Sequence, residues 1–218
     1  MLVIPNHLQR NTSRVAAEGY EKSGQRLMFL ARDRSELELK DSDILDIGCG
    51  VRFTATILNN GLDVKSYTGI EVHRPIIDFL KKEVADPRFH FIHWDVHNAL
   101  YNKDGLPMSS FTSLPVKGQY NAIWLFSVFT HLNPTDSTSM LDLIRKIITE
   151  NGKLVFTCFI NDEVETFLDR DANLVHAQYG ENFMHSIIAN TGWSIDNWHW
   201  GEIREKNPYG RMYVCSPV

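Results

Sequence analysis

Short apolar runs alternate along the chain with segments whose apolar residues recur at helical spacing. Five of these runs have the length of strands, and residues 120–126 are nearly all apolar, as expected for a strand that is covered on both faces. Because strands and helices alternate, the pattern indicates a largely parallel sheet with helices packed on both of its faces. The five predicted strands are residues 43–47, 65–71, 88–94, 120–126 and 153–160.

The segments between these strands predict helices with one apolar face. Residues 52–59 follow the first strand directly. A longer helix is expected to begin at Pro134, to carry an apolar stripe as far as Ile148 and to end at residues 151–152, which are Asn-Gly. A further helix is expected around residues 183–188.

Two strands close the chain, at residues 193–200 and 211–215. The connector between them is too short for a crossover helix, so the two strands are expected to pair antiparallel. The predicted fold class is therefore α/β: a Rossmann-like three-layer sandwich with a seven-stranded, mostly parallel sheet and an antiparallel last strand. Residues 41–218 are assigned to this domain, and residues 1–40 to an N-terminal helical extension that is part of the same unit.

Two segments have a position or composition that leaves their role open. Residues 11–37 show broken helical spacing and precede the first strand, so a helix there is expected either across the pocket or against the edge of the sheet. Residues 100–118 contain two prolines and two glycines and predict a long loop. A loop of this length is often functional, but a surface insertion is the favoured interpretation.

Composition narrows the classes of protein to which the chain can belong. Its 218 residues are 43% hydrophobic, which suits the core of one α/β domain. No run approaches the roughly 20 apolar residues of a membrane helix, and residues 1–5 are too short for a signal sequence, so a cytoplasmic protein is expected. The net charge of −5 disfavours nucleic acid as a partner. Cys49, Cys158 and Cys215 are far apart and are expected to be reduced core thiols.

The end of the first strand carries the most informative chemistry. Asp46 is followed by a turn that contains Gly48 and Gly50, and a helix begins directly afterwards. A strand, a glycine turn and a helix in this order build the nucleotide pocket of an open parallel sheet. A carboxylate just before the first glycine would repel a pyrophosphate and attract a cationic ligand. Glu71 and Asp95 also end strands, so three acids are expected at one edge of the sheet.

This arrangement resembles the class I S-adenosylmethionine-dependent methyltransferases. The Asp-x-Gly-x-Gly turn, Glu71, Asp95 and the stretch 125–132 carry the resemblance, which covers residues 43–160 by motif. The terminal strand pair also fits the family's seven-stranded sheet, whose last strand is inserted antiparallel. The resemblance implies S-adenosylmethionine as the cofactor and S-adenosylhomocysteine as the product. The sequence contains no cluster of Asp, Glu and His residues that predicts a metal site.

The resemblance gives a role to each matching residue. Asp46, Gly48 and Gly50 match the loop that holds the methionyl part of the cofactor. Glu71 matches the acid that accepts hydrogen bonds from both ribose hydroxyls. The other matches are Asp95 as acceptor from the adenine amino group, Val72 against the adenine ring, Val96 through its backbone N–H, and Leu125 and Phe126 beside the methionyl group.

One position departs from the family pattern and keeps an alternative open. Arg52 stands where the family often has a third glycine, so its side chain must point away from the ligand or reach the ligand's carboxylate. If Arg52 blocked the pocket, the chain would be a non-catalytic binding protein with a methyltransferase fold. A second alternative, an NAD(P)-dependent oxidoreductase, predicts Gly-x-Gly-x-x-Gly after the first strand, and this chain lacks that third glycine.

The residues that act on the substrate are predicted less directly. Methyl transfer requires alignment of the nucleophile with the methyl group, and an oxygen nucleophile also needs a base. His131 is the candidate base because it follows the strand whose end borders the methyl group, and a packing or capping role is its alternative. The candidate substrate residues are Tyr20, His176, Tyr179 and His199.

The sequence also limits the kind of acceptor. Nucleic-acid methyltransferases of this family that act on amino groups carry Asp/Asn-Pro-Pro-aromatic after the fourth strand, where this chain has Leu-Phe-Ser-Val at residues 125–128. A small-molecule acceptor is therefore expected. Methylation on O, N or C and the oligomeric state are not determined by the sequence.

Overall fold

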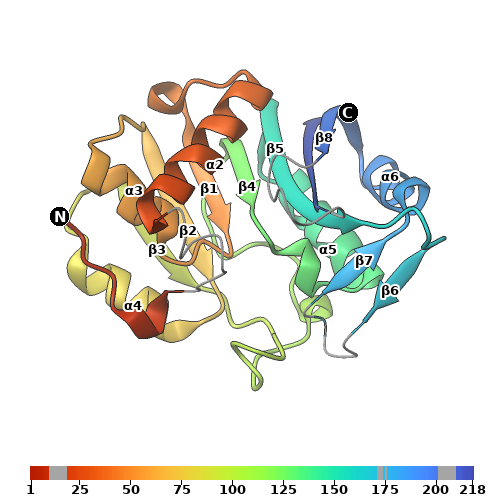
Figure 1. Cartoon of the computed structure of the whole chain (residues 1–218), viewed down its shortest axis with the longest axis horizontal. Coiled ribbons are helices and arrows are strands. Elements are labelled where there is room, and N and C mark those ends of the chain that lie inside the picture. The colour runs from red at the N-terminus through yellow and green to blue at the C-terminus, as the bar shows by residue number, and fades with distance from the viewer. Residues whose placement is uncertain (10–18, 171–173, 175, 201–209) are drawn as a thin grey trace.

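A nine-stranded sheet forms the centre of the computed structural model, which describes residues 1–9, 19–170, 174, 176–200 and 210–218 (Figure 1). The strands are β1 (Asp43–Ile47), β2 (Ser66–Glu71), β3 (Phe89–His93), β4 (Tyr120–Leu125), β5 (Ile148–Ile160), β6 (Phe167–Asp169), β7 (Ala177–Tyr179), β8 (Trp193–Trp200) and β9 (Gly210–Pro217). The helices are α2 (Tyr20–Ser35), α3 (Arg52–Asn60), α4 (Arg74–Glu83), α5 (Pro134–Arg145) and α6 (Glu181–Asn190).

Seven of the strands lie in the order β3-β2-β1-β4-β5-β9-β8. The strands from β3 to β5 pair in parallel, whereas β9 is antiparallel to both of its neighbours, β5 and β8. The predicted Rossmann-like sheet with an antiparallel last strand is therefore confirmed. The sequence did not indicate β6 and β7, a short antiparallel pair that joins the sheet through Phe159 and Ile160 of β5.

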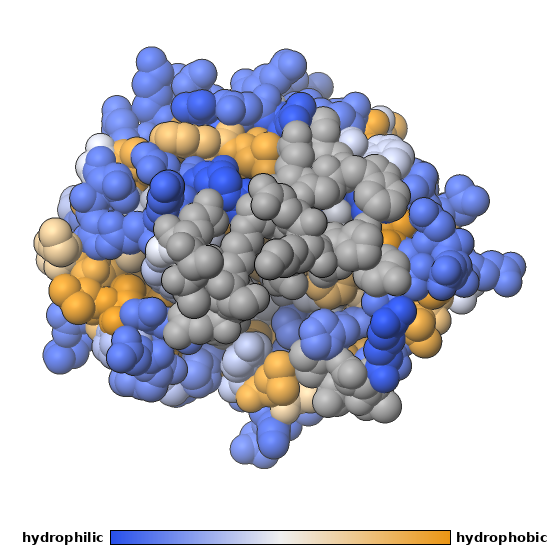
Figure 2. All heavy atoms as spheres, in the orientation of Figure 1, coloured by the Kyte–Doolittle hydropathy of each residue, from blue (hydrophilic) through white to orange (hydrophobic). Residues whose placement is uncertain are grey.

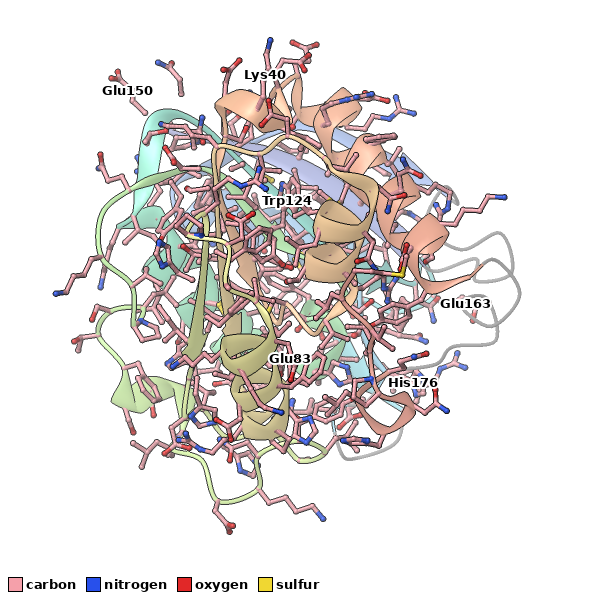
Figure 3. The ribbon with its side chains drawn as sticks, turned by 90° about the vertical axis from the view of Figure 1, so that its left-hand side faces the viewer. Lys40, Glu83, Trp124, Glu150, Glu163 and His176 are labelled. Carbon is pink, nitrogen blue, oxygen red and sulfur yellow. The ribbon has the colours of Figure 1, made fainter. Side chains whose placement is uncertain are left out.

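Helices cover both faces of the sheet, which gives three layers. The apolar sides of α2, α3 and α4 share one core cluster with alternate strand residues such as Ile44. The apolar sides of α5 and α6 share a second cluster with the other strand residues, such as Leu45. Trp124 lies in the interior while Lys40 and Glu150 lie at the periphery (Figure 3), and the described residues on the face seen in Figure 2 are mostly hydrophilic. The period of two along the strands thus separates the two cores.

The helix after β4 is shorter than the sequence pattern predicts. α5 ends at Arg145, and Ile148 begins β5 instead of extending the helical stripe. β5 pairs with β4 at Ile148 and again from Lys153, with a shift of register between the two. A Cβ at Gly152 would lie 2.7 Å from Cγ1 of Ile148, so this glycine allows a close approach within an irregular strand and does not end a helix.

The loop at residues 100–118 and the N-terminal segment both pack against the domain. Met108 and Leu114 are buried in the core cluster of α5 and α6, so the loop is not only a surface insertion. α2 contributes Leu27 and Met28 to the cluster that contains α3. Residues 11–18 of the predicted N-terminal helical segment lie outside the described residues.

α2 and α3 approach each other closely at Gly24. A Cβ on Gly24 would collide with Oγ1 of Thr56 and would lie 3.1 Å from Cγ of Arg52. The absence of a side chain at this position therefore sets the spacing of the two helices. Through this contact, the position of α2 depends on the helix that follows the glycine turn.

Gly24→Ala is expected to destabilise the protein by about 1–3 kcal/mol, because the added methyl group must push the two helices apart. At an exposed helical site the same change would stabilise by about 0.5–1 kcal/mol. Urea unfolding of this variant, with Lys22→Ala at an exposed position of the same helix as control, measures the difference. A gain in stability for Gly24→Ala would contradict the close packing of α2 on α3.

Candidate functional site

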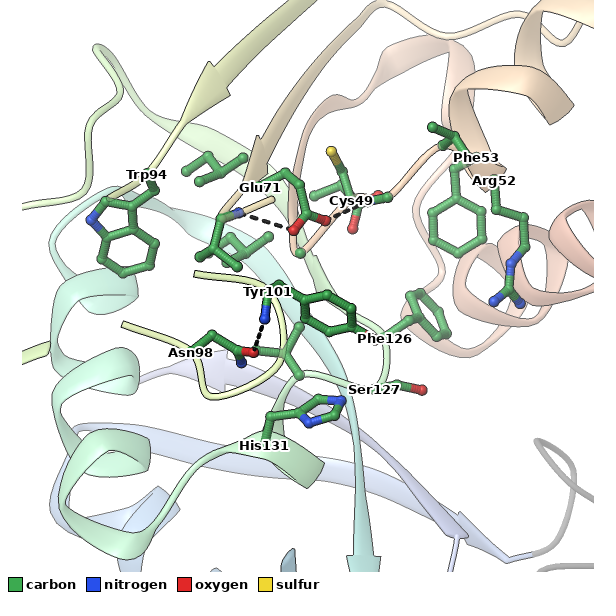
Figure 4. A pocket seen from close by; sticks show the side chains of 18 of the residues that line it. Cys49, Arg52, Phe53, Glu71, Trp94, Asn98, Tyr101, Phe126, Ser127 and His131 are labelled. Atoms are coloured by element: carbon green, nitrogen blue, oxygen red, sulfur yellow. Dashed lines mark hydrogen bonds between the residues drawn. The ribbon is translucent and has the colours of Figure 1, made fainter. Parts of the chain in front are cut away.

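The C-terminal ends of β1, β2 and β4 meet at a cavity of about 270 Å³. Its walls also include the start of α3, one side of α2 and the loop that follows β3 (Figure 4). β1 lies between β2 and β4, so the strand order reverses at this point. Open α/β sheets place their ligand pocket at such a point, at the carboxyl ends of the strands.

The turn after β1 brings the backbone to the cavity wall. Gly48 and Gly50 have positive φ angles of 73° and 53°. A Cβ on Gly48 would lie 2.7 Å from Cγ2 of Val128, so steric space as well as backbone conformation requires glycine. The N–H groups of Gly48 and Cys49 donate to the carbonyl oxygen of Ile70 at 2.8 and 3.0 Å, which ties the turn to β2.

Glu71 ends β2 as a buried carboxylate that lines the cavity. Its Oε2 accepts a hydrogen bond from the N–H of Gly50 at 3.0 Å, and its Oε1 accepts from the N–H groups of Val72 and His73, both at 3.0 Å (Figure 4). Charge-assisted bonds of this kind stabilise a carboxylate in a site that has little water. The backbone of two turns therefore fixes the position of Glu71.

Asp46 is a second buried carboxylate in the cavity wall. Its Oδ2 accepts a hydrogen bond from the hydroxyl of Tyr67 at 2.5 Å. Burial raises the pKa of Asp46 to about 7, and the charge of Glu71 adds to the rise, while the Tyr67 hydrogen bond and the charge of Arg52 act in the lowering direction. A carboxylate in this state gains strongly from a cationic partner, which would favour its charged form.

Arg52 extends along the cavity wall to α2. Its Nη1 donates to Oγ of Ser23 at 3.2 Å, and its Cζ lies 5.7 Å from the ring centre of Tyr20. Arg26, on the same side of α2, also lines the cavity. One part of the cavity wall therefore carries guanidinium groups, while the strand ends carry carboxylates. This separation of charge suits a zwitterionic ligand.

The structure places Val72, Val96 and Phe126 in the cavity wall but not the other two predicted contacts. Asp95 is exposed, and its Oδ1 accepts a hydrogen bond from Nδ2 of Asn102 at 3.0 Å. The loop after β3 therefore uses Asp95 for its own structure. Leu125 is fully buried in the core cluster of α5 and α6. Neither residue lines the cavity, so their assignment to the ligand stays a prediction.

His131 lies at the cavity in the short 3-10 turn Phe129–His131. Its Nδ1 is 2.9 Å from the carbonyl oxygen of Leu174. Because a carbonyl can only accept, Nδ1 carries the proton in this contact, and Nε2 is the basic nitrogen of the neutral ring. Ser127, just after β4, has a φ of 61° and also lines the cavity. A non-glycine residue in this conformation is strained, and such strain is often found at functional sites.

Of the four residues predicted to contact a substrate, only Tyr20 lines the cavity in the described part of the chain. Tyr179 is fully buried, and its hydroxyl donates to the carbonyl of Leu132 at 2.6 Å, so its role is structural. His176 is exposed and lies at the periphery (Figure 3). His199 belongs to β8, but its side chain lies outside the described residues.

Several residues of the cavity wall are not predicted by the sequence. Trp94, Asn98, Tyr101 and Met108 come from the end of β3 and the loop that follows it, and Arg26 comes from α2. The unusual length of this loop was the one sequence feature that pointed to the site. Nothing in the local sequence shows that the loop folds back over the strand ends.

Neither a metal centre nor a membrane span is found among the residues that the structure describes. No group of three or more His, Cys, Asp and Glu side chains there is arranged to hold a metal ion. No described helix combines the length and the apolar character needed to cross a membrane.

No model of a known protein family matches the chain. Solved methyltransferases nevertheless share its fold. The glycopeptide N-methyltransferase MtfA, complexed with S-adenosylhomocysteine, aligns with a TM-score of 0.62 at 10% identity over 90% of each chain. Magnesium protoporphyrin IX methyltransferase from Synechocystis PCC 6803, with bound S-adenosylmethionine, aligns with a TM-score of 0.62 at 12% identity over 100% of this chain and 87% of that one.

A third similar structure contains two bound small molecules. It is the 1,6-didemethyltoxoflavin-N1-methyltransferase of Burkholderia thailandensis with 1,6-didemethyltoxoflavin and S-adenosylhomocysteine, and it aligns with a TM-score of 0.63 at 12% identity over 92% of this chain and 79% of that one. At these identities the likeness establishes the fold. The chain therefore has the fold of the class I S-adenosylmethionine-dependent methyltransferases.

Proposed function

We propose that the protein is an S-adenosylmethionine-dependent methyltransferase that acts on a small-molecule acceptor. The observation that carries the proposal is Glu71, a buried carboxylate that three backbone N–H groups hold in the cavity wall. A carboxylate fixed in this way can accept hydrogen bonds from ribose hydroxyls without reorganisation. The presence of S-adenosylmethionine or S-adenosylhomocysteine in solved structures with this fold supports the same cofactor here.

The charges of the cavity fit the amino-acid part of this cofactor. Asp46 and the glycine turn would hold its cationic portion, since the raised pKa of Asp46 falls again when a cation binds beside it. Arg52 and Arg26 would hold its carboxylate, a group that guanidinium binds in a planar, bidentate manner. In this proposal Arg52 contributes to the cofactor site in place of the third glycine.

The apolar part of the cavity fits the adenine ring. Val72 and Val96 lie on strand ends that follow each other in the sheet, and Trp94 and Met108 complete this part of the wall. We assign the adenine contacts to these apolar surfaces and to the backbone N–H of Val96. Asp95 does not line the cavity, so this assignment does not use it.

His131 is proposed as the base. When bound, S-adenosylmethionine supplies a methyl group that its sulfonium charge has already activated. The protein aligns the acceptor with this group and excludes water. The hydrogen bond between Nδ1 of His131 and Leu174 sets the tautomer in which Nε2 is basic, so Nε2 can take the proton of a hydroxyl acceptor.

Two sets of observations support a small-molecule acceptor. Similar structures include methyltransferases named for a glycopeptide, a magnesium protoporphyrin and 1,6-didemethyltoxoflavin. The chain also lacks the Asp/Asn-Pro-Pro-aromatic motif of nucleic-acid methyltransferases, and its net charge is −5.

A binding protein without catalysis is the second candidate, and it differs from the first in showing cofactor binding without turnover.

Glu71→Ala is expected to weaken the binding of S-adenosylhomocysteine by about 1.5–3 kcal/mol, which is roughly 10- to 150-fold in Kd. Isothermal titration calorimetry measures the loss, with circular dichroism to confirm that the variant is folded. Glu83→Ala, at an exposed position of α4, is the matched control and should bind like the parent. Equal affinity of the Glu71 variant and the parent for S-adenosylhomocysteine would contradict the assignment of Glu71 to the ribose hydroxyls.

His131→Gln is expected to slow turnover about 100-fold or more, as loss of a general base does, while its affinity for S-adenosylhomocysteine stays within a few-fold of the parent. Release of S-adenosylhomocysteine in the presence of an acceptor found by metabolite screening measures the rate. His176→Gln, at an exposed position outside the cavity, is the control. A turnover rate for His131→Gln close to that of the parent would contradict the proposal that His131 is the base, and would leave it a packing role.

Asp46→Asn is expected to stabilise the protein without ligand at pH 8.5 by about 2–4 kcal/mol. The folded-state pKa of Asp46, about 7, lies above the ordinary value of 3.8, so the folded state binds the proton more tightly than the unfolded state. The contribution of Asp46 to the free energy of unfolding of the parent therefore falls as the pH rises from about 4 to 7, and stays lower above pH 7. Asparagine avoids this loss because it has no charge to bury.

Urea unfolding at pH 4 and pH 8.5 measures this effect, which should almost vanish at pH 4. Asp43 provides a control of opposite sign on the same strand. Burial alone would raise the pKa of Asp43, but hydrogen bonds from Lys65 and Ser66 lower it overall. Asp43→Asn should therefore destabilise the protein at pH 8.5. A destabilised Asp46→Asn variant at pH 8.5 would contradict the raised pKa of Asp46.

A further inference from the structure

The loop that follows β3 is closed by hydrogen bonds between its own residues. The N–H of His97 donates to the carbonyl of Leu106, and the N–H of Leu106 donates to the carbonyl of Asp95, both at 2.8 Å. Asn98 and Asn102 exchange backbone hydrogen bonds at 2.9 and 3.0 Å. These bonds determine the path of the backbone at Asn98, which lines the cavity.

The side chain of Asn98 is held with its two ends distinguished. Its Oδ1 accepts hydrogen bonds from the N–H groups of Leu100 at 3.0 Å and Tyr101 at 3.1 Å, which forms an Asx turn. Only the oxygen of an amide can accept, so these two bonds direct Oδ1 to the backbone and Nδ2 away from it. In the view of Figure 4 this amide lies between Trp94 and His131, among the side chains that line the cavity.

Nδ2 of Asn98 is a donor that the loop itself does not use. No acceptor that the structure describes receives a hydrogen bond from this atom, and the atom is not buried. The other asparagine of the loop differs in this respect. Nδ2 of Asn102 donates to Oδ1 of Asp95 and to the carbonyl of Val96, both at 3.0 Å. The amide of Asn102 therefore serves the loop, whereas Asn98 keeps two N–H bonds for a group in the cavity.

We propose that Asn98 is a ligand-binding residue whose Nδ2 donates a hydrogen bond to the adenosyl part of the cofactor. This inference rests on the proposed function and deepens it. Val96, two residues earlier in the same loop, carries the N–H that is assigned to the adenine ring, and both residues line the cavity. The ring nitrogens of adenine and the oxygens of ribose are acceptors, so an amide N–H complements them.

The Asx turn prepares Asn98 for this contact. A side chain that is already ordered loses little conformational freedom when the ligand binds, so more of the hydrogen bond appears as affinity. The turn and the donor use opposite ends of one amide. Their contributions can therefore be separated by substitution.

The test compares variants of the full-length protein by calorimetric titration with S-adenosylhomocysteine. Asn98→Asp keeps an oxygen for the turn, because aspartate also forms Asx turns, but it replaces the amide donor by a second acceptor. It should keep the urea midpoint of the parent and bind about 5- to 50-fold less tightly. 5′-Methylthioadenosine has the adenosyl part without the amino-acid charges, and its affinity should fall by a similar factor.

Two further variants complete the comparison. Asn98→Ala removes the turn and the donor together and should lose at least as much affinity as Asn98→Asp. Asn190→Asp introduces the same charge at an exposed position of α6, and it should bind both ligands like the parent.

An Asn98→Asp variant that binds both ligands like the parent would overturn the proposal, because the turn alone would then account for Asn98. A loss confined to S-adenosylhomocysteine would also overturn it, since the contact would then lie at the amino-acid part. A marked fall in the urea midpoint of Asn98→Asp would contradict the orientation of the amide. Titration of the parent keeps the two claims apart. A parent that binds, together with an Asn98→Asp variant of equal affinity, rejects only the Asn98 contact, whereas a parent that binds neither ligand rejects the methyltransferase and this contact with it.

Discussion

The buried carboxylate of Glu71 is the interaction on which the site depends. An ionised carboxylate away from water costs several kcal/mol unless donors surround it. Here the donors are the N–H of Gly50 from the turn after β1 and the N–H groups of Val72 and His73 from the turn after β2. One side chain therefore joins the two strand ends where the ligand is proposed to bind. The same bonds shape the glycine turn and the path of the chain after β2.

The other charged groups of the cavity extend this arrangement. Asp46 is buried beside Tyr67. Because burial disfavours the charged form of a carboxylate, the ionised form of Asp46 lowers the stability of the folded protein. Arg52 crosses from α3 to α2, and Gly24 allows the two helices to come close enough for its contact with Ser23. The helix before the first strand thus supplies one wall of the cavity. The resulting separation of anionic and cationic groups matches the charges that we assign to the cofactor.

The sequence was sufficient to predict the fold because strand, turn and helix patterns are local. One cavity brings together Asp46 of β1, the two glycines that follow β1, and Glu71, which ends β2. They meet there because parallel strands bring their carboxyl ends to the same edge of the sheet. Asp95 follows the end of β3 but does not line the cavity, and its Oδ1 accepts a hydrogen bond from Asn102, seven residues further along the loop. Tyr179 does not line the cavity either, and the bond from its hydroxyl to the carbonyl of Leu132 is recognisable only in the folded chain.

The loop at residues 100–118 and helix α5 show a second limit of sequence reasoning. Tyr101 reaches the cavity through hydrogen bonds within the loop, and no apolar period predicts where such a loop folds. Ile148 continues the helical stripe in sequence, but pairing with β4 places it in a strand. In both cases tertiary contacts decide the outcome, and local propensity does not.

The most direct test of the central claim is calorimetric titration of the folded protein with S-adenosylhomocysteine and S-adenosylmethionine. Each is expected to bind at one site per chain with a Kd in the micromolar range, about 7–8 kcal/mol of binding free energy. Absence of binding at millimolar concentrations, in a sample shown to be folded, would contradict the assignment of Glu71 and Asp46 to this cofactor. The cavity would then have to serve a different ligand.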